Sequence, residues 1–133
     1  MRILFDSNVW LAILTTDGRC RQMWRLARGH SRIHTSSAIL DEIEEKLRDK
    51  FTFHPRHVQL LTAFVRQQTI CVHVSIPPPK VCRDPDDDHV LAAAASADCA
   101  YLVTGDKDLL ALKSFVGFAI VTPREFAERI ASA

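Results

Sequence analysis

Three aspartates of this chain stand at the same distance from a pair of large apolar residues. Each lies three residues before the first member of its pair and four before the second, in the segments DSNVW (6–10), DDHVL (87–91) and DKDLL (106–110). On a helix these spacings lie on one face, so Asp6, Asp87 and Asp106 are each expected in the first turn of a helix. Asp6 and Asp106 also follow strand-like runs directly, and open α/β sheets bind ligands at the carboxyl ends of their strands. The sequence therefore predicts that the three carboxylates converge at one edge of a sheet.

Converging carboxylates repel one another unless a cation lies among them. A site made only of carboxylate oxygens suits a hard cation such as Mg²⁺ or Mn²⁺, and none of the six histidines or four cysteines shows a metal-binding spacing with these acids. The chemistry that fits is hydrolysis of a phosphodiester by a metal-activated water. The alternative for each acid alone is that it caps its own helix, as Asp84 before Pro85 would do.

The stretch RDPDDDHVLAAAA (83–95) holds four aspartates, which is more than helix capping requires. We take the apolar residues within 90–94 as the buried face of a helix that advances about 100° per residue. Asp87 then lies near the centre of that face and Asp88 at an edge. This phasing favours Asp87 as the metal ligand, while the motif by itself leaves the choice between Asp87 and Asp88 open.

Residues 19–34 carry five arginines and two histidines but no acid. Two interpretations stay open for this stretch: a solvated helix face, or a surface that follows the phosphates of a nucleic acid. On the second interpretation the RNA-binding candidates are Arg21, Arg25 and Arg28. Trp24 would then be a possible stacking platform, although a single tryptophan is more typical of a core.

Strand-like and helix-periodic runs alternate along the chain, which is typical of a parallel sheet covered by helices. Strands are predicted at 2–6, 32–35, 70–74, 101–104 and 118–122, and helices at 37–50, 55–68 and 85–97. The segment TPRE (122–125) opens a closing helix. We expect one domain over residues 1–133, a three-layer α/β/α sandwich with a central, mainly parallel, five-stranded sheet.

The composition is that of an ordinary globular protein. Of the 133 residues, 47% are hydrophobic and 25% charged, with a net charge of +1. No apolar run approaches the roughly 20 residues that a membrane span needs. The scattered cysteines are expected to be reduced thiols, as in a cytoplasmic protein.

The segments ILFDSNVW, SSAILDEIEEKL, RDPDDDHVLAAA, YLVTGDKDLL and IVTPREF follow one another in this order. As an ordered set they resemble the PIN-domain ribonucleases, and most closely the branch that contains VapC-like toxins of toxin–antitoxin pairs. The resemblance implies a single PIN-like nuclease domain that holds one or two Mg²⁺ or Mn²⁺ ions and hydrolyses single-stranded RNA. It also implies an antitoxin partner, a homodimer and no association with a membrane.

By position, the resemblance assigns the catalytic and metal-binding roles to four acids, namely Asp6, Glu42, Asp87 and Asp106. Asp84 matches a further acidic position, whereas Asp88 departs from the family, in which its place is often asparagine, and both stay candidate metal ligands. Ser7, Asn8 and Thr104 match polar positions that orient ligands or water. Periodicity alone does not choose between Glu42 and Glu44, because both flank the buried face of their helix.

Two other functions use related architecture. A non-catalytic PIN-fold binding module would keep the fold for protein contacts, and intact acids at the four matched positions count against it. A phosphoacceptor or aspartyl phosphatase needs either an acidic pair after the first strand or a second aspartate where this chain has Asn8. Both remain alternatives to the nuclease.

Overall fold

A computed structural model describes residues 1–132 of the chain, which form six strands and seven helices. In chain order the elements are β1 (Arg2–Phe5), α1 (Ser7–Thr15), α2 (Arg19–His30), β2 (Arg32–Thr35), α3 (Ser37–Asp49), α4 (Pro55–Gln68), β3 (Ile70–Cys71), α5 (Pro85–Ser96), β4 (Tyr101–Val103), α6 (Lys107–Leu112), β5 (Ser114–Phe115), β6 (Phe118–Val121) and α7 (Pro123–Ser132).

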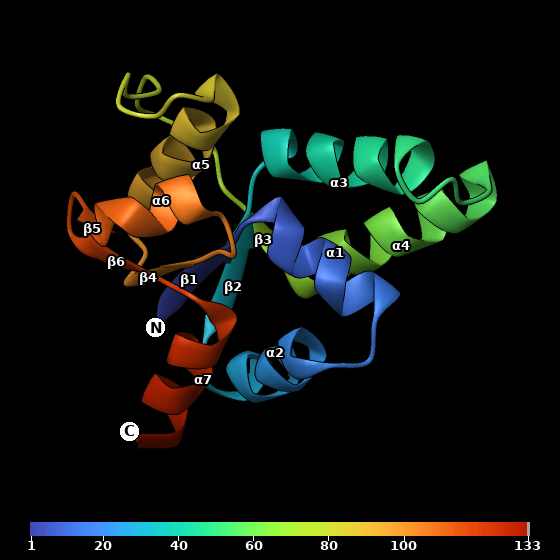
Figure 1. Ribbon diagram of the computed structural model, residues 1–133, viewed down its shortest axis with the longest axis horizontal. Helices are drawn as coiled ribbons and strands as arrows, with labels where there is room; N and C mark the ends of the chain where they lie inside the picture. Colours follow the sequence, from blue (N-terminus) through green and yellow to red (C-terminus); the bar gives the residue numbers. More distant parts are fainter. Residues whose placement is uncertain (133) are drawn as a thin grey trace.

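The strands form one sheet in the order β3-β2-β1-β4-β6-β5. All pairings are parallel except that of β5 with β6. Crossovers between parallel strands are right-handed, so α1 to α4 cover one face of the sheet and α5 and α6 the other, as Figure 1 shows. The closing helix α7 packs against α2. The predicted α/β/α sandwich with a mainly parallel sheet is confirmed.

The central strands are buried because helices cover both faces of the sheet. Ile3, Leu4 and Phe5 of β1 have no exposed surface, and neither do Leu102 and Val103 of β4. Such strands read as continuous apolar runs rather than as alternating ones. The first polar residue after each of these runs therefore stands at the carboxyl edge of the sheet.

The number of strands differs from the prediction. The sheet has six strands rather than five, because Ser114–Phe115 forms a two-residue antiparallel strand beside β6. A strand this short has no periodicity to detect, and its turn uses Gly117 at φ 88°. The predicted strand 70–74 pairs only over Ile70–Cys71. Within residues 1–132, no helix is long and apolar enough to cross a membrane, and all four cysteines are free thiols.

Candidate active site

A hollow of about 310 Å³ opens at the carboxyl ends of β1 and β4. Six acids line it, together with two lysines and a few residues of α1: Asp6, Glu42, Asp84, Asp87, Asp106 and Asp108, with Lys46, Lys50, Ser7, Asn8 and Leu11. The four acids assigned to catalysis thus share one hollow. The structure brings together side chains from the two ends of the chain and from its middle.

Asp6 caps α1 directly after β1 and is 4% exposed. Its Oδ1 accepts a hydrogen bond from the backbone N–H of Ser7 at 2.7 Å, and its Oδ2 accepts from Thr104 Oγ1 at 2.8 Å and from Asn8 Nδ2 at 3.1 Å. Burial raises the pKa of Asp6, and the charge of Asp106 raises it further, while the three hydrogen bonds oppose the shift. The hydrogen bonds therefore fix the direction of the carboxylate, but none of them comes from a positively charged group.

Asn8 and Thr104 join the ends of β1 and β4. Asn8 Oδ1 accepts from the backbone N–H of Gly105 at 3.0 Å, and Thr104 Oγ1 accepts from the N–H of Asp106 at 3.0 Å. Both side chains also donate to Asp6. These bonds fix the separation of Asp6 and Asp106, so the two polar residues orient the acids of the hollow.

Asp87 and Asp106 face one another across the hollow. Asp106 caps α6, with Oδ2 accepting from the N–H of Leu109 at 3.2 Å. Burial raises the pKa of Asp87 to about 7, and the charge of Asp106 and a hydrogen bond with its carboxylate act in the same direction. In the absence of a cation, a raised pKa favours the protonated form of Asp87 near neutral pH.

Glu42 reaches the hollow from α3, whereas Glu44 is not among its lining residues. Burial raises the pKa of Glu42, and the charge of Asp6 raises it further, while a hydrogen bond from the Ser7 hydroxyl lowers it. Periodicity did not distinguish the two glutamates. The packing of α3 against α1 makes the distinction.

Asp88 does not line the hollow, although it follows Asp87 directly. It is 6% exposed, and its Oδ1 accepts from the backbone N–H groups of Val81 at 3.2 Å and Cys82 at 3.0 Å. Burial opposes its ionisation, but the two backbone hydrogen bonds, together with the Cys82 side chain and the charge of His89, lower the pKa of Asp88. Asp88 therefore anchors the preceding loop to α5, whereas Asp84, the N-cap of α5, lines the hollow.

The model of the PIN domain family matches residues 2–108. This chain belongs to the PIN-domain family. It is 30% identical to the uncharacterized protein MJ1680 of Methanocaldococcus jannaschii, over 96% of this chain and 90% of that protein.

Solved structures share the fold of this PIN domain at low sequence identity. VapBC2 of Rickettsia felis, solved with a DNA fragment from its promoter, gives a TM-score of 0.71 at 12% identity, over 92% of this chain and 98% of that one. VapC20 of Mycobacterium tuberculosis gives 0.65 at 17% identity, over 88% and 98%. PAE2754 of Pyrobaculum aerophilum gives 0.68 at 17% identity, over 100% and 91%.

The donor set of this PIN domain fits a hard divalent cation. Every acid that lines the hollow offers carboxylate oxygens, and burial together with repulsion between carboxylates raises the pKa values of Asp6, Glu42 and Asp87, which a bound cation would offset. Within residues 1–132, no three His, Cys, Asp or Glu side chains already form a group that could hold a metal ion. Binding would therefore require the carboxylates to draw together.

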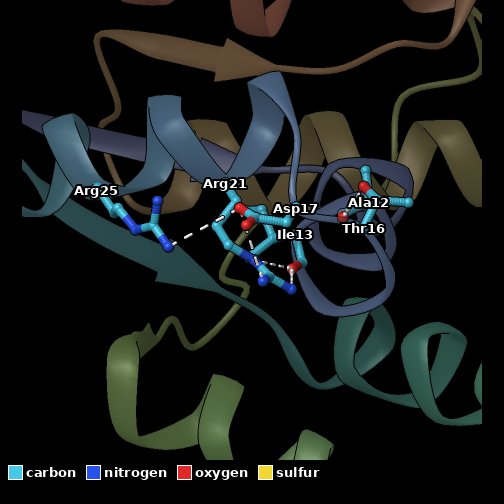
Figure 2. A network of polar contacts seen from close by, with 6 residues as sticks. All are labelled: Ala12, Ile13, Thr16, Asp17, Arg21 and Arg25. Atoms are coloured by element: carbon cyan, nitrogen blue, oxygen red, sulfur yellow. Dashed lines mark hydrogen bonds and ion pairs between the residues drawn. The ribbon is translucent and has the colours of Figure 1, made fainter.

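The arginine-rich stretch lies elsewhere in the PIN domain. Arg21 donates from Nε and Nη2 to the carbonyl oxygen of Ile13, at 3.0 and 2.8 Å (Figure 2). Asp17 lies 3.9 Å from Arg21 Nη1 and 4.0 Å from Arg25 Nη2. Arg21 therefore ties α2 to the end of α1 through Nε and Nη2, and its role in RNA binding stays a prediction.

Arg25 and Arg28 line another hollow, of about 560 Å³, which also includes Arg32 at the start of β2. No residue lines both this hollow and the acidic one. Trp24 is 7% exposed and packs edge-on against Phe64, so it belongs to the core and is not an open stacking platform.

Sequence reasoning missed three charged residues that line the acidic hollow, Lys46, Lys50 and Asp108. Lys46 and Lys50 follow Glu42 at intervals of four, which places them on the same face of α3. That spacing could have identified the two lysines from the sequence. No spacing pointed to Asp108, because its partner at 2.8 Å, Arg83, comes from a distant loop.

Proposed function

We propose that this PIN domain is a metal-dependent endoribonuclease that hydrolyses phosphodiester bonds of single-stranded RNA. The observation that carries the proposal is the convergence of Asp6, Glu42, Asp87 and Asp106 in one hollow. Burial and mutual repulsion make this arrangement costly unless a cation binds there. Family membership supports a phosphodiester as the substrate.

Asp6, Asp87 and Asp106, with Glu42, would hold one or two Mg²⁺ or Mn²⁺ ions, and Asp84 would support them from the rim. Such an ion supplies charge stabilisation for the phosphoryl oxygens and lowers the pKa of a bound water. Asp6 contributes a carboxylate held in direction by Ser7, Asn8 and Thr104. A bound cation would offset the burial and repulsion that raise the pKa of Asp87, and would so favour its ionised form as a ligand.

The proposed biological role is that of the toxin of a cytoplasmic toxin–antitoxin pair. Among the structures that share the fold, VapC20 is described as a toxin that cleaves the sarcin-ricin loop, and VapBC2 was solved on its promoter DNA. The corresponding partners here would be a cognate antitoxin and a second copy of the chain. A small reading frame next to the gene, coding for a DNA-binding protein, would support this role.

The test uses purified protein and an unstructured RNA oligonucleotide. Cleavage is expected with Mg²⁺ or Mn²⁺ and not in excess chelator, and an Asp106→Asn variant should bind the RNA without cutting it. The melting temperature should rise with added metal, because only the folded state gathers the acids. Cleavage that continues in chelator, with metal-free protein verified, would contradict the mechanism. Binding without cleavage under every metal tested would instead indicate a binding module.

A further inference from the structure

Part of the acidic hollow lies between α1 and α3, which pack against each other beyond the ends of the strands (Figure 1), and we call this part the groove. Leu11 lines it from α1, and Lys46 and Lys50 line it from α3. Together with Glu42, the lysines form one stripe of α3 in steps of four residues. Each step advances about 6 Å along the helix axis, which is comparable with the separation of successive phosphates in an extended strand.

Both lysines are exposed, and within residues 1–132 neither lies within 4.0 Å of a carboxylate. Among the residues that line the hollow, Lys46 and Lys50 are the two with positive charge, and Arg83 outside it is paired with Asp108 at 2.8 Å. When the acids hold a cation, the lysines of α3 are therefore the positive charges left for a polyanion.

On the other side of α3, the residues next to the acidic hollow are mostly acids. A neighbouring hollow of about 300 Å³ lies between α3 and α5 and shares Glu42 with the acidic one. Its other charged lining residues are Asp41, Glu45 and Asp86, and His89 is its one potential cation. Beyond Glu42, α3 therefore offers two lysines to the acidic hollow and two acids, Asp41 and Glu45, to the neighbouring one.

We infer that Lys46 and Lys50 bind the phosphates next to the scissile one, so that single-stranded RNA leaves the active site along α3 in the groove beside α1. This inference rests on the proposed ribonuclease function. It assigns the direction of the bound strand and a phosphate-binding site to two residues outside the catalytic set. Lys46 is the nearer of the two to Glu42 and contacts the phosphate closer to the cleaved bond.

The experiment measures binding of a fluorescent, unstructured RNA to the Asp106→Asn protein over a series of salt concentrations. Adding Lys46→Ala and Lys50→Ala should weaken binding and lower the log–log salt slope by about 1.4, since each lost contact on a single strand is worth about 0.7. In the active protein the same pair should raise KM and leave kcat within about twofold. Lys46→Arg with Lys50→Arg should restore the slope.

The matched control is Arg56→Ala with Arg66→Ala on α4, which removes the same charge from a surface that lines neither hollow. Its slope should stay unchanged, and the melting temperatures should show that all variants fold. If the unaltered protein cleaves RNA and the lysine pair leaves the slope unchanged, the inference is wrong and the ribonuclease stands. If the unaltered protein neither binds nor cleaves RNA, the proposed function fails and the inference fails with it.

Discussion

Thr104 Oγ1 donates a hydrogen bond to Asp6 Oδ2 across 2.8 Å and joins the ends of two neighbouring strands. The same oxygen accepts from the N–H of Asp106 at 3.0 Å. One hydroxyl therefore sets the direction of two of the proposed ligands. Because the hydroxyl contacts both residues, its removal is expected to lower activity.

Thr104→Val should reduce cleavage about fivefold to tenfold, because it removes a hydrogen bond worth about 1 kcal/mol and frees Asp6 to turn. Since that bond lowers the pKa of Asp6, its loss should raise the pKa further, and the acidic limb of the pH–rate profile should move upward. Thr104→Ser keeps the hydroxyl and should retain activity. Full activity in Thr104→Val, which keeps the methyl group and loses only the hydroxyl, would show that the hydrogen bond does not matter.

Asp87→Asn should abolish cleavage and change how stability depends on pH. The pKa of Asp87 is raised to about 7 in the folded protein, so between about pH 4 and 7 the folded state binds more protons than the unfolded state. The parent protein should therefore lose stability as the pH rises through this range, and the variant should lose less. Thermal melts at pH 5 and pH 8 in chelator test this, and a pH-independent difference would contradict it.

Asp88→Asn should keep substantial activity, because a single oxygen accepts both backbone hydrogen bonds and asparagine retains that oxygen. Asp88→Ala should be less stable by about 1–3 kcal/mol, since two backbone donors lose their acceptor. Urea unfolding and cleavage assays separate the two effects. An Asp88→Asn protein as inactive as Asp87→Asn would mean that Asp88 holds the metal after all.

Arg21→Ala should lower the free energy of unfolding by about 1–3 kcal/mol, because two charged hydrogen bonds to the Ile13 carbonyl are lost. The salt dependence of RNA binding should not change. Arg25→Ala is the control on the same helix, since its contact with Asp17 is only a 4.0 Å ion pair with an exposed partner. A flatter salt slope in Arg21→Ala would show that Arg21 contacts the RNA phosphates.

Arg25 and Arg28 keep their predicted role as RNA-binding candidates. Arg25→Ala with Arg28→Ala should flatten the salt dependence if RNA reaches their hollow at the far end of β2. Comparison with the lysine pair of α3 under identical conditions tells which surface the strand follows. An unchanged slope would indicate a solvated face.

The parts of the fold that the sequence predicted are those with a local cause. Apolar runs specified the central strands, and the phase of each aspartate with its apolar pair placed Asp6, Asp87 and Asp106 at one edge. Residues decided by tertiary packing were not predictable. Glu42 differs from Glu44 only in how α3 meets α1, and Arg21 finds its acceptor in another helix. Asp88 lies one residue from a hollow that it never enters, because a loop supplies its donors.

The loop that Asp88 anchors also decides the chemistry of a nearby thiol. Burial raises the pKa of Cys82, and a hydrogen bond with Asp88 and the charges of Asp88, Asp87 and Asp106 act in the same direction. Only a thiolate reacts readily with peroxide, disulfides or alkylating agents. Burial and the nearby carboxylates therefore keep Cys82 protonated, so this thiol should react slowly with peroxide and alkylating agents although it lies close to the acidic hollow.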